Sequence, residues 1–411
     1  MYKCLNLVCV IVVALTARLA GCASHVPTEH VQSRGATPFR AIWVTRWDYR
    51  SEADVKRAIS DAASLGVTDV MWQVRGQCDA YYKSDLEPWG ETLLKDLPPG
   101  VTAPTFDPLS IALAEAHAKG LKVHAWMNMM PLWKGTTAPK AANHPFHTHP
   151  EWRLRDAKGV AQALNEHYVI VNPVLPAVQD HIVAVCRDIV SRYPIDGIHM
   201  DYIRFVSDTM KDPAAYPGDA DSLAQLAITL GRAVKKDASG KLVAEDAAAF
   251  RDLKRDSITR IVRRIRVEAI GSRRDIAFSA AVWRRPELAR DQYLQDAVDW
   301  LRTGTLDRAM PMIYTDKQEQ FQSDLDAWIA AGGKRITPGI ANYLHTPEQT
   351  SEQIDYSVRR GAAGVAIFAY SSLFESVDPN QDKRPAEVQK RAARRESLRS
   401  LFARQGDVPR K

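Results

Sequence analysis

The stretch Ile195-Asp196-Gly197-Ile198-His199-Met200-Asp201-Tyr202-Ile203-Arg204 is a short apolar run that ends in ionisable side chains. If it forms a strand, period-two alternation places Gly197, His199 and Asp201 on one face and the apolar side chains on the other. Polar residues at the carboxyl end of a strand line the catalytic face of a parallel barrel. The stretch therefore predicts a buried strand with Asp201 as the first catalytic candidate, and an acid that caps a following helix is the alternative.

Seven further apolar runs flank this stretch and alternate with amphipathic segments. The eight predicted strands are 40–45, 69–74, 123–128, 197–202, 276–281, 308–313, 336–341 and 364–369. Eight strand-helix units close most naturally into a (β/α)8 TIM barrel, an α/β fold. An open doubly wound sheet is the alternative, but no glycine-rich phosphate loop follows the first strand. Long connections over 129–173 and 205–245 follow the third and fourth strands, and we expect them to wall the catalytic face.

The first residues have the pattern of a bacterial lipoprotein signal. Lys3 precedes an apolar segment over 5–15, and Leu19-Ala20-Gly21-Cys22 matches a lipobox. We therefore predict that Cys22 carries the lipid, with palmitate among its acyl chains, and that the protein is anchored in the cell envelope, at the outer membrane facing the periplasm. The predicted segments are a signal peptide over 1–21, a flexible tether over 22–36, a barrel domain over 37–402 and a disordered basic tail over 403–411.

Charge and cysteine content bear on two questions, whether the protein binds nucleic acid and whether it forms disulfides. The 55 basic and 49 acidic residues leave a net charge of only +6, and the arginines of 260–266 alternate with apolar residues as on the solvated face of a helix. No base-reading module accompanies them, so we predict no nucleic-acid partner. Outside the signal and Cys22, the chain has two cysteines, Cys78 and Cys186, which we predict to be free thiols.

Polar and aromatic side chains at the predicted strand ends form a set that suits a sugar. Aromatic rings can stack on sugar faces, while amides and arginines can hold hydroxyls or carboxylates. A single aromatic here could equally be core, so the clustering carries the prediction, and a satisfied interior histidine is the alternative for His199. The predicted substrate-binding residues are Arg46, Trp47, Gln73, Arg75, Asp79, Trp126, Asn128, His199, Arg204, Trp283, Tyr314, Asn342 and Tyr370.

Glycosidic cleavage usually needs two carboxyl groups. Asp201 is the candidate for one, and Asp316, after the sixth strand, and Glu375, after the eighth, are candidates for the other. Each of these two could equally be a helix-capping acid. The histidines in 143–150 lack an acid or cysteine that would complete a zinc motif, so we predict no metal and no other cofactor.

Four motifs in this order resemble the glycosyl hydrolase-like 10 family. They are Gln73-Val74-Arg75-Gly76-Gln77-Cys78-Asp79-Ala80-Tyr81-Tyr82, Phe106-Asp107-Pro108-Leu109, His124-Ala125-Trp126-Met127-Asn128, and Ile195 to Tyr202. The resemblance runs from about Phe39 to Glu375 and implies a (β/α)8 glycoside hydrolase that acts on bacterial cell-wall or related polysaccharide. Members of the family include envelope lipoproteins that cleave glycan strands of peptidoglycan already stripped of stem peptides.

The resemblance also implies roles for single residues. Asp201 matches the family's acid at the end of the fourth strand, and the groove motifs contain Arg75, Asp79, Trp126 and Asn128. Many relatives carry a second Asp directly after that acid, where this chain has a tyrosine. A denuded strand would carry free lactyl carboxylates, which Arg75 or Arg204 could bind through bidentate hydrogen bonds. Hydrolysis of an amino-sugar exopolysaccharide and a non-catalytic carbohydrate-binding lipoprotein are the alternatives.

Overall fold

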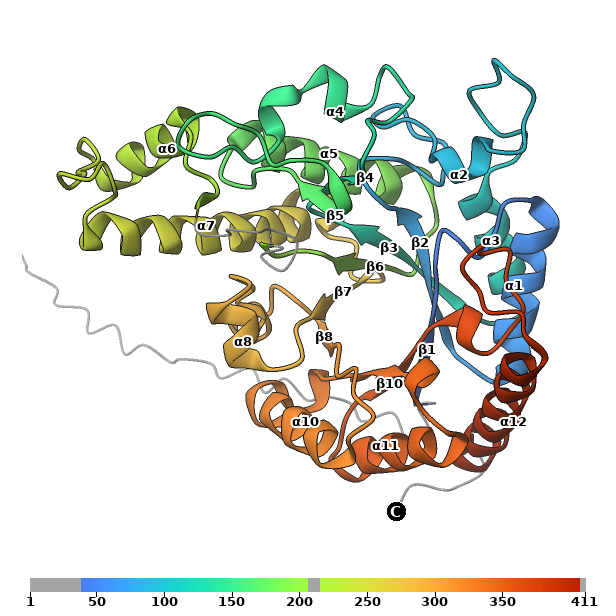
Figure 1. Cartoon of the computed structure of the whole chain (residues 1–411). Helices are drawn as coiled ribbons and strands as arrows, with labels where there is room; N and C mark the ends of the chain where they lie inside the picture. Colours follow the sequence, from blue (N-terminus) through green and yellow to red (C-terminus); the bar gives the residue numbers. More distant parts are fainter. Residues whose placement is uncertain (1–37, 206–214, 407–411) are drawn as a thin grey trace, which may run out of the picture. The chain divides into compact units, whose positions relative to one another are not determined.

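The computed structural model describes residues 38–205 and 215–406, which belong to one compact unit. Eight parallel strands form a sheet in the order β8-β7-β6-β3-β2-β1-β10-β9. Isolated parallel bridges from Ala309 to Ile336 and from Met312 to Gly339 join β8 to the segment that leads into β9. The sheet therefore closes into a barrel with helices around it, which confirms the predicted (β/α)8 fold (Figure 1).

Each predicted strand overlaps one strand of the barrel. The barrel strands are β1 (Phe39–Val44), β2 (Asp69–Arg75), β3 (Lys122–Asn128), β6 (Gly197–Asp201), β7 (Ala277–Val282), β8 (Arg308–Pro311), β9 (Gly339–Ala341) and β10 (Gly364–Phe368). β8 and β9 are shorter than predicted because only isolated bridges continue their pairing. The spacing of apolar runs was therefore enough to locate all eight strands.

Helices cover the outside of the barrel, and a few lie within the long connections that leave its strands. They are α1 (Glu52–Leu65), α2 (Glu91–Leu94), α3 (Pro108–Ala118), α4 (Pro145–Thr148), α5 (Pro176–Arg192), α6 (Ala220–Leu230), α7 (Ala244–Arg264), α8 (Pro286–Asp291), α9 (Ala297–Arg302), α10 (Gln318–Gly332), α11 (Pro347–Arg359) and α12 (Pro385–Gly406). A π-helical segment continues α7 (Ile265–Ile270), and short 3-10 turns cover Pro150–Trp152, Gly333–Arg335, Asn342–Leu344 and Tyr370–Ser372. Local sequence explains α1: Ser51 and Asp54 form a capping box at its start, and Gly66 ends it in the left-handed conformation. α12 continues to Gly406, beyond the predicted domain end at 402.

Three long connections leave the carboxyl ends of barrel strands. The one after β3 holds an antiparallel hairpin of β4 (Pro131–Gly135) and β5 (Asn165–Ile170), and the one after β6 leads to α6. These are the two that the sequence indicated. The third, residues 76–107 after β2, was not recognised as long because its short turns resemble the start of a helical unit. It provides much of the wall of the site described below.

Side-chain alternation in β6 follows the prediction. Ile198 and Met200 face the helix layer, while His199 lies inside the barrel, where Trp43 donates a hydrogen bond to its Nε2 (3.1 Å). A Cβ on Gly197 would lie 2.1 Å from Nδ1 of His124, so a glycine is required where this histidine fills the barrel. This packing fixes β6 in a register that carries Asp201 to its carboxyl end.

Three sequence predictions concern the lipoprotein signal, the tether and the cysteines. Cys22, the signal and the tether lie outside the described residues. Among the residues that are described, no helix is long and apolar enough to cross a membrane. Cys78 and Cys186 are both buried and free, as predicted.

Candidate active site

Asp201 lies at the end of β6 with only 7% of its surface exposed. Its Oδ1 accepts hydrogen bonds from the backbone N–H of Tyr202 (2.6 Å) and from a terminal nitrogen of Arg204 (3.3 Å). Burial raises the pKa of this carboxyl, and the Arg204 charge only partly offsets the effect. Tyr202 has a φ of +50°, a strained conformation for a residue with a side chain, and such strain is concentrated at functional sites. Asp201 is thus a buried acid that favours its protonated form more than an exposed aspartate does.

Arg204 faces the same carboxyl from three residues along the chain. Its guanidinium carbon lies 4.3 Å from the ring centre of Tyr202 and 5.5 Å from that of Trp283. Its buried Nε has no hydrogen-bond partner among the described residues. Arg204 is therefore held by aromatic faces and retains a donor for a ligand.

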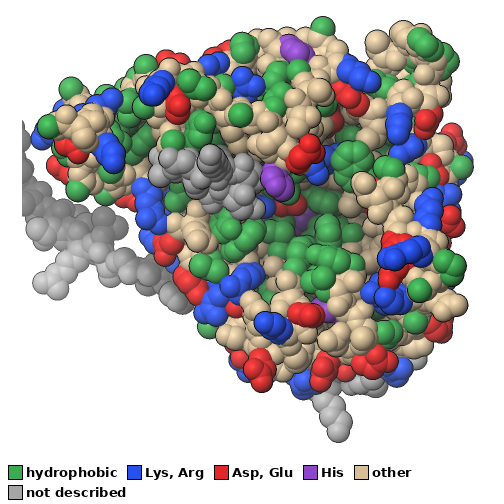
Figure 2. Space-filling view, viewed as in Figure 1, with side chains coloured by type: hydrophobic (Ala, Val, Ile, Leu, Met, Phe, Trp, Pro, Cys, Tyr) green, Lys and Arg blue, Asp and Glu red, His purple; other side chains and the backbone are tan. Residues whose placement is uncertain are grey.

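Aromatic rings line the barrel next to this pair. Tyr314 stacks on Phe368 with ring centres 5.3 Å apart, and Trp126 and Tyr343 meet the same phenylalanine edge-on. Figure 2 shows hydrophobic side chains gathered in a hollow at the centre of this face. Sequence reasoning missed Phe368 and Tyr343, although the alternation of β10 places Phe368 two residues after the interior Ala366. Stacked aromatics around a hollow suit the apolar faces of sugar rings.

A second buried acid, Asp79, lies in the connection after β2. Its Oδ1 accepts hydrogen bonds from the backbone N–H groups of Gly76 and Gln77. Burial raises its pKa, and the positive charge of Arg46 opposes that rise. The close approach of this arginine explains Gly76, because a Cβ there would lie 2.7 Å from the Arg46 side chain. Asp79 therefore belongs to a built polar cluster.

Arg46 links this cluster to the neighbourhood of Asp201. Its guanidinium lies over the ring of Trp47, 4.5 Å from the ring centre, and donates a hydrogen bond to the hydroxyl of Tyr168 (3.1 Å). The Tyr168 ring in turn contacts that of Tyr202, with centres 5.1 Å apart. Tyr168 comes from β5, so the sequence offered no sign that it would lie here. Contacts thus run without a break from the β6 end to the loops after β1 and β2.

Some of the buried polar atoms that have no partner among the described residues lie in this region. Most buried polar groups in proteins are hydrogen-bonded, so unpaired ones at a barrel mouth indicate places for a ligand or water. Within the described part of the chain these atoms are Nε of Arg46, Oε1 of Gln77, Oδ1 of Asn128 and Nε of Arg204. Sugar hydroxyls, which both donate and accept, could satisfy all of them.

Arg75 does not present its charge to this region. Its guanidinium bonds both oxygens of Glu87, the sulfur of Cys78 and the backbone carbonyls of Asn128 and Met129, so every N–H has a partner. Its side chain is 1% exposed and that of Glu87 is fully buried. The prediction that Arg75 binds a substrate carboxylate is therefore corrected: the residue ties the loop after β2 to the end of β3.

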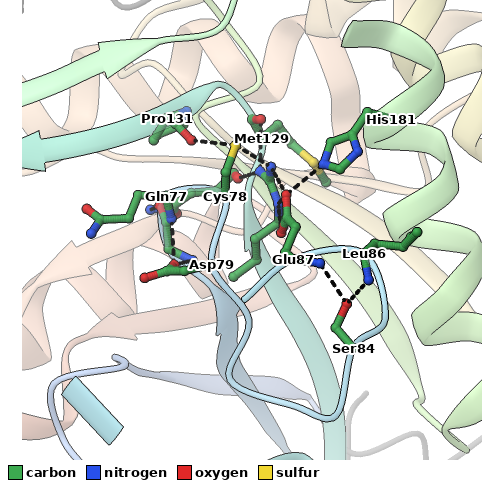
Figure 3. A network of polar contacts seen from close by, with 12 residues as sticks. Gln77, Cys78, Asp79, Ser84, Leu86, Glu87, Met129, Pro131 and His181 are labelled. Carbon is green, nitrogen blue, oxygen red and sulfur yellow. Dashed lines mark hydrogen bonds and ion pairs between the residues drawn. The ribbon is translucent and has the colours of Figure 1, made fainter. Parts of the chain in front are cut away.

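His181 of α5 completes this internal network. Its Nε2 lies 2.9 Å from Oε1 of Glu87 (Figure 3). Burial alone would raise the pKa of Glu87, but the Arg75 charge and the histidine hold it well below its usual range. Sequence reasoning missed both Glu87 and His181, because neither follows a strand directly.

Four other predicted binding residues are engaged inside the protein. Both ring nitrogens of His199 have partners, Trp43 and Ser279, and burial lowers its pKa to about 3, which corresponds to the interior histidine named as the alternative. The remaining three bond as follows: Gln73 accepts from the backbone N–H of Arg46, Asn342 bonds Ser372 and Thr350, and Tyr370 donates to Asp61 of α1. The structure thus gives these side chains supporting contacts within the barrel and its helix layer.

The two candidates for the second carboxylate lie in a different environment from Asp201. Asp316 and Glu375 are both exposed, the first just before α10 and the second after the turn that follows β10. Neither side chain accepts a hydrogen bond in the described part of the chain that would fix its position; the backbone oxygens of both accept one. Among the predicted site acids, only Asp79 shares the burial of Asp201.

A pocket of about 1120 Å³ opens beside the cluster of Asp79 and Arg46. Its walls come from the connections after β1, β2, β3 and β10, which are neighbours in the barrel. Trp47 and Asp79, both predicted to bind substrate, lie in its lining. The pocket therefore belongs to the same face of the barrel as Asp201.

The histidines of the connection after β3 do not converge. His144 bonds the carbonyl of Gln77, His147 bonds that of Pro139, and His149 pairs with Glu151. Within residues 38–205 and 215–406 there is no group of three or more His, Cys, Asp or Glu side chains that could hold a metal ion.

Comparison with known proteins gives a family match over most of the barrel. The pattern that defines the family described as Glycosyl hydrolase-like 10 matches residues 38–347. The chain is similar to glycosyl hydrolase YngK of Bacillus subtilis (strain 168), with 25% identity over 310 residues, 67% of this chain and 54% of that protein. It is also similar to glycosyl hydrolase DigH of Escherichia coli (strain K12), with 24% identity over 353 residues, 74% of each chain. The chain thus spans about half the length of the first and three quarters of the second.

A solved structure shares the fold. The PgaB (BpsB) glycoside hydrolase domain from Bordetella bronchiseptica superposes with a TM-score of 0.58 and 13% identity, covering 89% of this chain and 99% of that one. At this identity the likeness concerns the arrangement of strands and helices, and it agrees with the closed barrel described above.

Proposed function

This chain belongs to the glycosyl hydrolase-like 10 family, and from that premise we propose that it hydrolyses glycan strands of peptidoglycan that have lost their stem peptides. The class of enzyme, a glycoside hydrolase, agrees with the names of its relatives YngK and DigH. The observation that carries the proposal is the buried Asp201 with its raised pKa, set at a barrel mouth among aromatic rings and unpaired donors.

Asp201 acts as the general acid in this proposal. A raised pKa makes a carboxyl a better proton donor near neutral pH than an exposed aspartate, and Asp201 would donate its proton to the glycosidic oxygen as the carbon–oxygen bond breaks. The sugar that loses this oxygen develops positive charge, and a second carboxylate either attacks it or removes a proton from the attacking water. The outcome is one water consumed and one glycosidic bond cleaved, with Asp201 reprotonated by the end of the cycle.

Asp79 is the stronger candidate for the second carboxylate. It is 2% exposed, backbone N–H groups hold one of its oxygens, and it lines the pocket beside the mouth. Asp316 and Glu375, the candidates from sequence, are exposed and held by no side-chain contact among the described residues. Substituting Asp79, Asp316 and Glu375 one at a time and measuring kcat would show which of them supplies the second carboxylate.

Arg204 is proposed to recognise the lactyl carboxylate of a denuded strand. Arg75, the other candidate from sequence, has all its donors engaged, whereas the Nε of Arg204 has no partner among the described residues. An arginine with a free donor beside the cleaved bond favours substrates that carry a carboxylate there.

The lipobox at Cys22 supports a location in the cell envelope. We propose that acyl chains on Cys22, palmitate among them, anchor the protein in the outer membrane so that the barrel faces the periplasm, where glycan strands are exposed. Replacing Cys22 with alanine is expected to move the protein from the membrane fraction to the soluble fraction. Retention in the membrane fraction would contradict the lipid anchor.

The decisive experiment incubates the full-length protein, purified in mild detergent, with intact and with amidase-denuded peptidoglycan. Mass spectrometry of the released material is expected to show short glycan fragments from denuded peptidoglycan only, and none with Asp201→Asn. Fragments from an amino-sugar exopolysaccharide alone would shift the substrate to that polymer. Binding without any fragments would identify a non-catalytic carbohydrate-binding lipoprotein.

A further inference from the structure

The pocket of about 1120 Å³ is larger than catalysis at one bond requires. Ligand pockets that bury a drug-sized molecule measure roughly 300–1,000 Å³, so this one can hold more than a single sugar ring. Asp201 and Arg204 are not among its lining residues, so the pocket extends the mouth to one side. A segment of polymer that passes Asp201 could enter it.

Lysines without acidic partners are the main charges on the pocket wall. Lys95, Lys134 and Lys140 are exposed there, and no carboxylate among the described residues lies within ion-pair distance of them. The three acids of the lining already accept hydrogen bonds: Glu87 from Arg75, Asp79 from backbone N–H groups, and Glu91 from the backbone N–H of Lys140. With Arg50, which lies 3.7 Å from Asp96, the lining holds four cationic side chains against three carboxylates, and the three lysines are the cations without an ion-pair partner in the described part of the chain.

Aromatic side chains complete the lining. Trp47 and Trp89 are partly exposed on it, and Trp133 is held in place by a hydrogen bond from its indole N–H to the carbonyl of Thr137 (2.7 Å). Rings of this kind bind the apolar faces of sugars, while lysines bind carboxylates. The combination fits a polysaccharide that carries carboxylates and is unsuited to a purely apolar ligand.

The pocket is connected to the catalytic acid by direct contacts. Trp47 lines the pocket and lies under the guanidinium of Arg46, which bonds Tyr168, whose ring contacts that of Tyr202. Tyr202 directly follows Asp201. A continuous chain of contacting side chains thus joins the barrel mouth to the pocket.

We propose that this pocket, which Asp79 also lines, is a subsite that binds a carboxylate-bearing glycan segment of more than one sugar ring while the bond beside Asp201 is cleaved. The proposal rests on the proposed function for the choice of polymer, but binding in the pocket does not depend on cleavage. Lys134 and Lys140 provide its charge selectivity, and Trp47 provides stacking. The substrate would then be selected by the charges at Lys134 and Lys140 in addition to the contacts at the reacting bond.

The test measures binding in the full-length Asp201→Asn protein, so that cleavage does not enter the result. Dissociation constants are determined for three oligosaccharides of equal length: denuded peptidoglycan glycan, chitin oligomer and polyuronate. The test variant adds Lys134→Ala and Lys140→Ala. The matched control adds Lys236→Ala and Lys241→Ala, two exposed lysines between α6 and α7 that lie outside the pocket lining.

We expect the test variant to bind the denuded glycan about five- to tenfold more weakly, as the loss of two exposed charge contacts would predict, with a much smaller effect on the chitin oligomer. The control should match the parent for all three ligands. Affinity for the denuded glycan should also fall with added salt in the parent more than in the test variant.

Two outcomes would overturn the proposal: equal losses for charged and neutral oligomers, or no loss for either. Polyuronate that binds as tightly as denuded glycan, with the same lysine dependence, would support a carboxylate subsite and contradict the choice of peptidoglycan. Failure of the proposed hydrolysis is seen separately, as the absence of fragments with the parent enzyme. The binding results can still be interpreted in that case, because they do not depend on cleavage.

Discussion

Arg75 with Glu87 and Arg204 with Asp201 are two buried arginine–carboxylate pairs at the same end of the barrel, one after β2 and one after β6. Glu87 receives three hydrogen bonds from Arg75 and one from His181, whereas Asp201 receives a single contact of 3.3 Å from its arginine. The pKa of Glu87 is lowered and that of Asp201 is raised. A buried carboxyl near an arginine is therefore locked in its charged form only when hydrogen bonds to the charge outweigh desolvation.

The comparison separates two uses of the same residue types. Glu87 and Arg75 leave nothing for a ligand and hold the loop after β2 in place, which suits a structural role. Burial raises the pKa of Asp201, and the Nε of Arg204 has no partner among the described residues, so this pair offers an acid that favours protonation and a free donor for chemistry. Each prediction below tests one side of this contrast.

Asp201→Asn should give the largest effect. We expect turnover of denuded glycan to fall by about 10²–10⁴, the usual contribution of a general acid, because asparagine cannot donate the proton. The dissociation constant for the uncleaved glycan should stay close to that of the parent. Steady-state kinetics and equilibrium binding measure both, and residual turnover above a tenth of the parent value would remove Asp201 from the catalytic role.

Arg75→Ala should affect stability more than chemistry. Removing one partner of a fully buried ion pair leaves the Glu87 charge uncompensated and costs about 3–5 kcal/mol of unfolding free energy. Urea denaturation measures this loss. Lys390→Ala, which breaks an exposed pair with Glu387, is the matched control and should cost less than about 1 kcal/mol. Similar losses in both variants would refute the structural role of the buried pair.

The pH dependence of stability should have opposite signs for the two acids. Glu87 has a lowered pKa, so its contribution is present above the reference value of 4.5 and is lost as the pH falls below it. The advantage of the parent over Glu87→Gln should therefore shrink in acid. Asp201 has a raised pKa, so it destabilises the fold progressively as the pH rises above 3.8, and Asp201→Asn should gain on the parent over that range. Denaturation midpoints of each variant relative to the parent, measured from pH 3 to 8, should change with pH in opposite directions. Changes in the same direction would contradict the difference between Glu87 and Asp201.

Arg204→Lys tests the role of the guanidinium group next to Asp201. A lysine keeps the charge but lacks the planar guanidinium that lies over Tyr202 and Trp283, so we expect about a tenfold loss in kcat/KM on denuded glycan. The loss should be smaller on a chitin oligomer, which has no lactyl carboxylate. Equal losses on both substrates would indicate that Arg204 only supports Asp201.

The smallest effects are expected at the exposed acids. Asp316→Asn and Glu375→Gln should each change kcat less than about twofold, in line with surface substitutions that shift energies by about 0.5 kcal/mol. Asp79→Asn, tested beside them, should reduce kcat by about a hundredfold if it supplies the second carboxylate. A large loss at Asp316 or Glu375 would restore the original sequence candidates.

Much of the fold was readable from the sequence because its signal is local. The apolar runs recur at the spacing of strand-helix units, and alternation within β6 follows from backbone geometry, so the barrel and the place of Asp201 at a strand end could be predicted. The ends of α1 also depend on local signals, the capping box of Ser51 and Asp54 and the left-handed Gly66. These features depend on neighbours along the chain and on nothing distant.

Tertiary structure decided which charged residues of the site have a structural role and which remain available to a substrate. Arg75 and Arg204 both lie near the end of a predicted strand, so the sequence does not distinguish their roles. In the fold, Glu87 binds the guanidinium of Arg75, and His181 of α5 bonds Glu87. The guanidinium of Arg204 lies against aromatic rings instead. The wall of the pocket likewise joins loops from four strands. The sequence by itself determined the barrel and the strand-end residues such as Asp201 and Arg204. Contacts between distant segments brought Tyr168 to the mouth and decided which charged side chains remain free to act, because the charge state of a group depends on everything packed around it.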